Sequence, residues 1–137
     1  MTPADAPRIS AGPEIRPTVL VVDDDVLVRM AVSENLRDAG FQVLEAASAH
    51  DALGVMLAQM PIHVLVTDLR MPGAMDGFGL ALAARGSAPD TKVLVMSAFL
   101  PENQRAGLGA FEFLQKPFHP QLLIDRVRAM LGEAEGG

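Results

Sequence analysis

The stretch TVLVVDDD, residues 18–25, joins five β-branched or apolar residues directly to three acidic ones. A short run of this kind predicts a strand that is buried on both faces, as in a parallel sheet covered by helices. Behind the aspartates, four apolar residues recur at helical spacing: Val28, Val32, Leu36 and Ala39. Gly40 is the expected end of this helix, because helices commonly end at a glycine. The stretch therefore predicts a strand, an acidic turn and a helix in succession.

The same alternation of short apolar runs and helical patterns continues along the chain. Four more strands are predicted, at 41–44, 62–67, 92–96 and 111–115. The helix that ends before Pro61 is expected to bury an apolar stripe made of Leu53, Met56, Leu57 and Met60. A short helix is expected near 78–85. The last helix is expected to bury Leu123, Val127, Met130 and Leu131.

Strands that alternate with helices indicate a parallel sheet with helices on both faces. We predict a flavodoxin-like (βα)5 fold, which is an α/β doubly wound parallel sheet with strand order 2-1-3-4-5. Residues 98–110 are close to the minimum length for a crossover between parallel strands, and Gly107 and Gly109 disfavour a long helix there. A short or irregular fourth helix is therefore expected, with one or two turns near 102–106.

One folded domain is expected, over residues 18–131 of the 137. Residues 1–17 contain four prolines and no periodic apolar pattern, which predicts a flexible leader. Residues 132–137 are small, acidic and rich in glycine, which predicts a flexible tail. This length is too short for a domain of that size and a conventional second domain, so a stand-alone protein is expected.

Composition and charge exclude several classes of function. The net charge of -6 and the isoelectric point near 4.9 argue against binding of nucleic acid, which depends on clustered Lys and Arg. No apolar run reaches the roughly 18 residues that a membrane span needs, and no secretory signal precedes the first strand, so a soluble cytoplasmic protein is expected. Because the chain has no cysteine, any metal must bind to oxygen or imidazole.

Polar side chains follow or close four of the five predicted strands. Asp23 and Asp24 follow the first strand, and the third, fourth and fifth are followed by Asp68, Ser97 and Lys116. Because the carboxyl ends of parallel strands meet at one edge of the sheet, these groups should converge there. Crowded carboxylates need a counter-ion, and Mg²⁺ prefers carboxylates, carbonyls and water.

This set of groups suits the transfer of a phosphoryl group to a carboxylate. Asp68 would be the nucleophile, a metal would neutralise charge on the phosphoryl oxygens, and Ser97 and Lys116 would act as donors to them. Structural roles remain open for each residue alone. Asp25, and also Asp24, can cap the following helix, and Asp68 can begin a turn. Four such coincidences at successive strand ends are improbable, which favours the functional interpretation.

The residues resemble the receiver domain of two-component response regulators over 18–131. The motifs that carry the resemblance are VVDDD at 21–25, DLRMP at 68–72, Ser97-Ala98 and Lys116-Pro117-Phe118. The resemblance implies phosphorylation of Asp68, with Ser97 and Lys116 in the reaction and a peptide bond before Pro117 that is usually cis. It also implies a Mg²⁺ or Mn²⁺ site made by Asp23, Asp24, Asp68 and the main-chain carbonyl of Arg70, and switch residues Ser97 and Phe113.

The resemblance also implies a phosphodonor, which is a histidine kinase or a histidine phosphotransfer protein. We expect a signalling protein that promotes its own phosphorylation and dephosphorylation, and is not otherwise an enzyme. Its output would run through protein contacts, or it would act as a phosphate shuttle or sink. One alternative is a receiver-like scaffold whose partner binding ignores phosphorylation. A hydrolase is disfavoured, because Arg70 stands where such phosphatases carry a second acidic residue.

Overall fold

A computed structural model describes residues 16–58, 61–98 and 111–132 of this protein. Its strands are β1 (Thr18–Val22), β2 (Gln42–Ala46), β3 (Val64–Asp68), β4 (Lys92–Ser97) and β5 (Glu112–Gln115). Its helices are α1 (Val26–Asp38), α2 (Ala49–Leu57), α3 (Gly77–Ser87) and α5 (Pro120–Met130). All paired strands are parallel, and their order is β2-β1-β3-β4-β5. The predicted flavodoxin-like fold class and strand order are confirmed.

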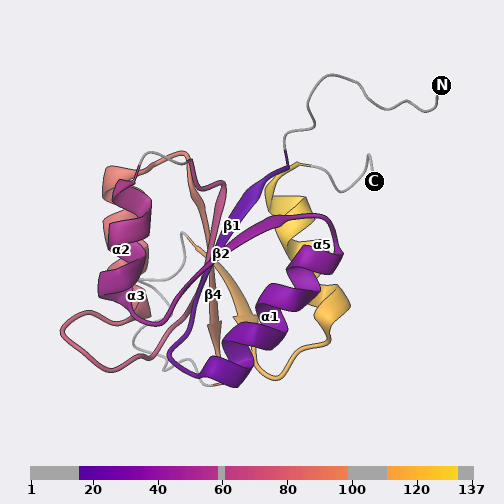
Figure 1. The fold of residues 1–137 in the computed structure, drawn as a ribbon, viewed down its shortest axis with the longest axis horizontal. Coiled ribbons are helices and arrows are strands. Elements are labelled where there is room, and N and C mark those ends of the chain that lie inside the picture. The colour runs from indigo at the N-terminus through magenta and orange to yellow at the C-terminus, as the bar shows by residue number, and fades with distance from the viewer. Residues whose placement is uncertain (1–15, 59–60, 99–110, 133–137) are drawn as a thin grey trace.

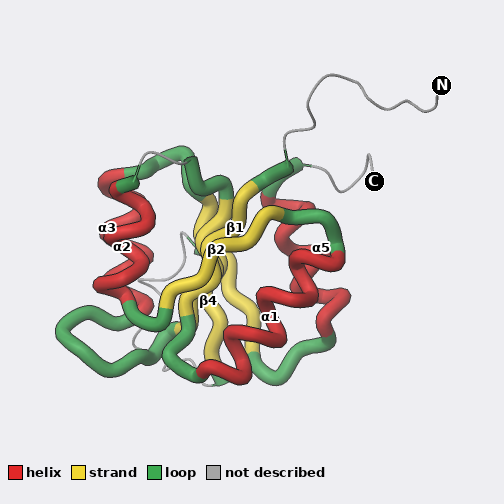
Figure 2. The backbone as a smooth tube through the Cα atoms, in the orientation of Figure 1, coloured by secondary structure: helices red, strands yellow, loops and turns green. Residues whose placement is uncertain are grey.

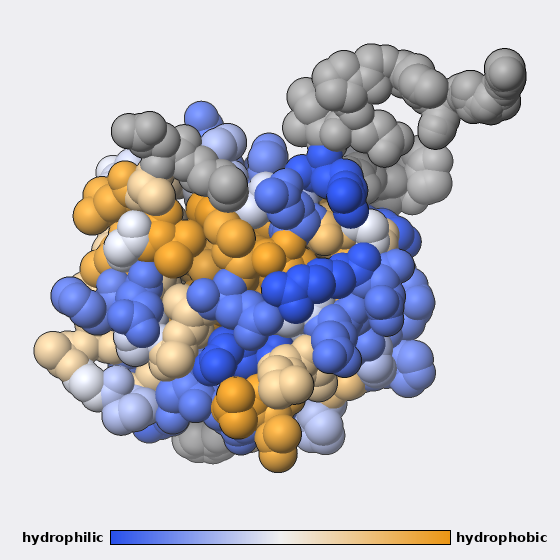
Figure 3. Space-filling model, viewed as in Figure 1, coloured by the Kyte–Doolittle hydropathy of each residue, from blue (hydrophilic) through white to orange (hydrophobic). Residues whose placement is uncertain are grey.

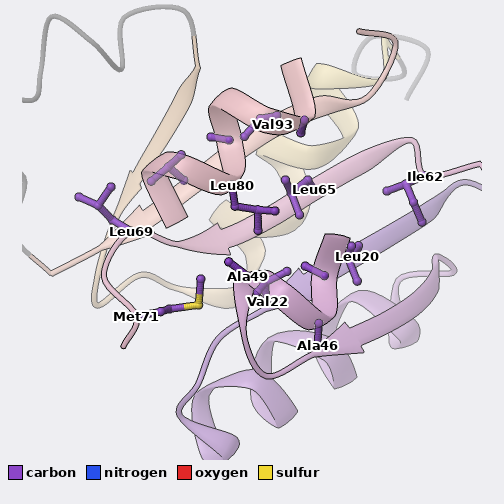
Figure 4. Packing of buried hydrophobic residues seen from close by; sticks show 14 residues of the cluster. Leu20, Val22, Ala46, Ala49, Ile62, Leu65, Leu69, Met71, Leu80 and Val93 are labelled. Carbon is purple, nitrogen blue, oxygen red and sulfur yellow. The ribbon is translucent and has the colours of Figure 1, made fainter. Parts of the chain in front are cut away.

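Helices cover both faces of the sheet. Figure 1 shows α1 and α5 on one side of the strands and α2 and α3 on the other, and Figure 2 shows the sheet as the middle layer. Side chains of β1 alternate between the two faces: Val19 and Val21 pack with α1 and α5, whereas Leu20 and Val22 pack with α2 and α3. Both sets are fully buried, as expected for a strand between two helical layers. Figure 4 shows the packing on the side of α2 and α3.

The start and end of α1 follow the sequence signals. Asp25 is the residue that caps its N-terminus, because its carboxylate accepts hydrogen bonds from the main-chain N–H groups of Leu27 and Val28. The helix ends before Gly40, which has a φ of +102° that most side chains avoid. The helix therefore ends just before Gly40, as predicted, and Asp25 caps its N-terminus.

The prediction that Leu57 lies on the buried side of its helix is wrong. Leu57 is 81% exposed, whereas Ala49 and Ala52 are buried near the start of α2. The small side chains of these alanines let the first turns of α2 approach the sheet, and the helix ends at Leu57. Leu53 and Met56 are partly buried against the core, and Met60 falls outside the described residues.

Several predictions concern residues outside the described ranges. The fourth helix predicted within 98–110 falls almost wholly in this category, as do most of the leader and the tail. Among the helices that the structure describes, none is long and apolar enough to cross a membrane.

Candidate functional site

The sheet order brings together aspartates that are distant in the sequence. β1 and β3 are neighbours, so the turn after β1 lies beside Asp68 at the end of β3. One carboxylate oxygen from each of Asp23, Asp24 and Asp68 lies within 4.8 Å of the other two. The predicted convergence of these three side chains at the carboxyl edge of the sheet is thus present in the structure.

Lys116 reaches into this cluster from the end of β5. Its Nζ donates to Asp68 Oδ1 at 2.9 Å and to Asp23 Oδ2 at 3.2 Å. Its main-chain N–H donates to the carbonyl oxygen of Ser97 at 2.8 Å, which ties it to the end of β4. The peptide bond between Lys116 and Pro117 is cis. One ammonium group therefore bridges two of the three clustered carboxylates.

Asp23 is the most deeply buried of the three, with 1% of its surface exposed. Its Oδ1 accepts from the main-chain N–H of Asp25 at 2.9 Å, and its own N–H donates to the Ala46 carbonyl at 3.2 Å. Its carbonyl oxygen accepts from Arg29 Nη1 at 2.8 Å. With Lys116 on Oδ2, each of the four polar atoms of Asp23 has a partner, so its position is tightly fixed.

The environment changes the proton affinity of two groups in the site. Burial raises the pKa of the Asp68 carboxyl above its ordinary value, and the nearby charges of Asp23 and Asp24 add to this effect while Lys116 opposes it. Burial acts to lower the pKa of Lys116, but its contacts with Asp68 and Asp23 outweigh burial and raise it. The site therefore disfavours the ionised form of Asp68 and favours the charged form of Lys116.

The remaining predicted site residues occupy distinct positions. Ser97 closes β4 next to β3 and is 4% exposed. Phe113 lies in β5 opposite Val95 and is partly buried against the core beneath α2 and α3. Arg70 lies in the loop after β3, two residues beyond Asp68, with an exposed side chain. These positions put Ser97 at the same edge as the carboxylates and Phe113 two residues back along the neighbouring strand.

The donor set fits a hard divalent cation. Three carboxylates converge, whereas Lys116 is the one cationic group that contacts their oxygens among the described residues. Oxygen ligands of this kind are those that Mg²⁺ or Mn²⁺ prefers. Asp24 is exposed, so water could reach a cation bound by the cluster and would supply further oxygen ligands.

One residue with contacts in this region carries no functional signal in the sequence. Arg29, in the first turn of α1, contacts both the main chain of Asp23 and the side chain of Glu45 in β2. Its spacing from Asp23 is not a recognisable motif. The only signal in the sequence is an arginine six residues after Asp23, the first aspartate of the acidic turn.

Comparison with known proteins identifies the family. The sequence model described as "Response regulator receiver domain" matches residues 19–128. The transcriptional regulatory protein PrrA of Mycobacterium tuberculosis is 39% identical over 118 residues, which cover 84% of this chain and 50% of that protein. The response regulator MprA of the same species is 37% identical over 116 residues, which cover 82% of this chain and 50% of that protein. The chain thus spans about half the length of these curated relatives.

Solved structures agree with this match. The chemotaxis protein CheY4 of Vibrio cholerae has a TM-score of 0.76 and 30% identity, covering 85% of this chain and 99% of that chain. A response regulator receiver protein from Sinorhizobium medicae has a TM-score of 0.79 and 28% identity, covering 87% of this chain and 97% of that chain. With the motifs, the fold and the sequence match in agreement, this chain belongs to the response regulator receiver domain family.

Proposed function

We propose that the carboxylate of Asp68 is the phosphoacceptor of this receiver domain. The observation that carries the proposal is that Asp68 Oδ1 lies 2.9 Å from Lys116 Nζ while its carboxylate shares a cluster with Asp23 and Asp24. In the proposed reaction an Asp68 oxygen attacks the phosphorus of a phosphohistidine. The P–N bond breaks, and the imidazole nitrogen leaves with the bonding electron pair. The product is an acyl phosphate on Asp68.

Each neighbouring group has a proposed part in this transfer. Asp23, Asp24, Asp68 and the Arg70 carbonyl would hold Mg²⁺ or Mn²⁺, which supplies charge neutralisation for the phosphoryl oxygens. Lys116 moves its hydrogen bond from the Asp68 carboxylate to a phosphoryl oxygen. The hydroxyl of Ser97 donates to another, and the displacement of Ser97 pulls on Ala98 and lets Phe113 change position.

We propose that the phosphodonor, a histidine kinase or a histidine phosphotransfer protein, docks on the first turns of α1. Val26, Leu27 and Met30 are 51%, 73% and 46% exposed there, directly after the acidic turn. Figure 3, in the orientation of Figure 1, shows an apolar patch at the lower edge of the molecule, at the N-terminal end of α1. A groove of about 300 Å³ lies further along α1, between Val28, Val32 and the segment Lys116-Pro117-Phe118. An apolar helix of the donor would thus bring its histidine beside Asp68.

We further propose that residues 18–131 are the complete unit for this chemistry and that it operates in the cytoplasm. Output then runs through protein contacts, or the phosphoryl group is passed onward. The unit is proposed to promote its own phosphorylation and dephosphorylation, since the carboxylate cluster, Lys116 and Ser97 all belong to one chain. The position of Lys116 against the nucleophile favours this role over a scaffold that ignores phosphorylation.

Incubation with acetyl phosphate and Mg²⁺, followed by intact mass measurement, tests the proposal. We expect the mass of one added phosphoryl group in the wild type, and none in Asp68→Asn or after chelation of the metal. Asp90→Asn, which changes an exposed aspartate outside the cluster, is the matched control and should behave as the wild type. A full mass shift in Asp68→Asn would exclude this residue as the acceptor. A wild type that gains no mass from acetyl phosphate or from a phosphorylated histidine protein would favour the scaffold.

A further inference from the structure

Arg29 connects the acidic turn to the edge strand of the sheet. Its Nη1 donates to the Asp23 carbonyl oxygen at 2.8 Å, and its Nε donates to Glu45 Oε1 at 3.2 Å. The side chain of Arg29 is 17% exposed, so these contacts lie mostly under the surface. A single planar guanidinium group thus holds the main chain of the turn and a side chain of β2 in one arrangement.

β2 therefore holds Asp23 at two points. The first is direct, since the Ala46 carbonyl accepts from the Asp23 N–H at 3.2 Å. The second runs through Glu45 to Arg29 and on to the Asp23 carbonyl. Together they fix the peptide groups on both sides of the Asp23 α-carbon. The direction of the Asp23 and Asp24 side chains depends on these peptide groups.

We propose that Arg29 is a positioning residue for the metal site. Asp23, Asp24 and Asp68 repel one another, and a turn without support would relax by moving its carboxylates apart. Arg29 prevents this movement by holding the Asp23 carbonyl toward α1 and β2. The inference rests on the proposed function, because it takes the three carboxylates as ligands of Mg²⁺.

Because Arg29 is positively charged, the direction in which its substitution changes Mg²⁺ affinity is informative. A positive charge near a cation site repels the cation. If this repulsion were the only effect of Arg29, removing its charge would strengthen the binding of Mg²⁺. Loss of positioning has the opposite effect, and loss of a residue that orients metal ligands typically weakens metal binding by about 10-fold to 100-fold. The direction of the change in affinity therefore separates a positioning role from a purely electrostatic one.

Arg37 offers a matched control within the same helix. It contacts the other carboxylate oxygen of Glu45 at 3.1 Å and donates to the Val43 carbonyl at 3.2 Å. The hydrogen bonds and ion pair described for its side chain therefore stay on β2, and none of them involves Asp23. Substitution of Arg37 removes an arginine and an ion pair with the same glutamate, while the contact with the acidic turn remains.

The experiment compares Arg29→Met with Arg37→Met. Mg²⁺ affinity is measured by isothermal titration calorimetry, amide shifts of residues 23–25 by NMR, and folding by circular dichroism. We expect Arg29→Met to bind Mg²⁺ about 10-fold more weakly or worse and to shift these amides. Arg37→Met should stay within about twofold of the wild type, because its contacts lie outside the turn.

Two further variants keep the test decisive if Arg29→Met does not fold. Arg29→Lys retains the charge but replaces the guanidinium fork by one ammonium, which cannot repeat both contacts, so it should also bind Mg²⁺ more weakly than Arg37→Lys. Equal or tighter Mg²⁺ binding by a folded Arg29 variant would overturn the positioning role. A wild type that binds no Mg²⁺ would instead overturn the proposed metal site itself.

Discussion

Gly77, at the start of α3, lies directly against the main-chain carbonyl of Asp68. A Cβ atom at Gly77 would overlap the Asp68 carbonyl oxygen, and the Gly77 N–H also donates to the Leu69 carbonyl at 2.9 Å. Backbone groups cannot yield as a flexible side chain can. The absence of a side chain at Gly77 therefore allows α3 to begin immediately beside the proposed phosphoacceptor.

We predict that Gly77→Ala lowers the free energy of unfolding by about 1 to 3 kcal/mol, because the new methyl group forces the helix and the strand apart. Gly54→Ala is the control. It lies inside α2 with nothing within 4 Å of an added Cβ, so it should raise stability by about 0.5 to 1 kcal/mol. Urea unfolding followed by circular dichroism measures both. Changes of the same sign would contradict the close contact.

Asp24 and Asp25 are predicted to have separate roles although they are adjacent. Asp24→Ala should weaken Mg²⁺ binding and leave the metal-free stability within about 0.5 kcal/mol of the wild type. Asp25→Ala should cost about 1 kcal/mol of stability, because it removes the cap of α1, and should change Mg²⁺ binding less. Calorimetric titration and thermal unfolding of both variants separate the roles. Equal losses of metal affinity would show that the ligands are misassigned.

Asp68 should destabilise the metal-free protein when it is ionised. Burial raises its pKa above the ordinary value of 3.8, so the folded state binds the proton more tightly than the unfolded state. Stability contributed by this group is present at low pH and is lost as the pH rises through the raised pKa. With a chelator present to remove metal, Asp68→Asn should therefore unfold at a higher temperature than the wild type at pH 7. The difference between the two unfolding temperatures should shrink as the pH approaches 4. A constant difference across this range would contradict the shift.

Lys116→Met should destabilise the metal-free protein, because it leaves the buried carboxylate of Asp23 and the partly buried carboxylate of Asp68 without their shared cation. The expected loss is about 1 to 3 kcal/mol, and Mg²⁺ should restore part of it. Lys92→Met, at an exposed position, is the control and should change stability by less than about 0.5 kcal/mol. Chemical unfolding with and without Mg²⁺ provides the comparison. A loss that Mg²⁺ does not reduce would point to a purely structural lysine.

Ser33 is fully buried in α1, and its hydroxyl oxygen has no hydrogen-bond partner within the described part of the chain. Ser33→Ala should raise stability by about 1 kcal/mol, because it removes an unsatisfied polar group and introduces a better helix former. Ser87→Ala removes an exposed hydroxyl that donates to the Ala83 carbonyl and should be nearly neutral. Thermal unfolding of the two variants tests this difference. Destabilisation by Ser33→Ala would indicate a partner for the hydroxyl.

The fold could be predicted from the sequence because a strand that is buried on both faces is a continuous apolar run. The run Thr18–Val22 was predicted with its observed bounds, since every residue in it is buried. Strand ends were less well defined where polar residues take part in pairing. β2 extends through Glu45 to Ala46, beyond the predicted end at Leu44, because main-chain pairing with β1 continues there whatever the side chain. Leu57 was misplaced because hydropathy alone does not show where a helix leaves the sheet.

The convergence of the candidate site followed from topology. Once strands alternate with helices, the carboxyl ends of β1, β3, β4 and β5 meet at one edge, and the residues that follow them were therefore predictable. Contacts made by the main chain could not be predicted in this way. The approach of Gly77 to Asp68 and the hydrogen bond from Arg29 to the Asp23 carbonyl depend on the exact path of loops, which no side-chain pattern records.

The order of the strands has a consequence for how the protein folds. Lys116 meets Asp23 across 93 residues and Asp68 across 48, and it follows β5, which comes after the other four described strands in the sequence. Contacts of such long sequence separation form late, because much of the chain must be ordered before they close. A nascent chain that ends before Lys116 contains all three clustered aspartates without the ammonium group that bridges two of them. The contact between Lys116 and Asp68 therefore reports that β5 has docked.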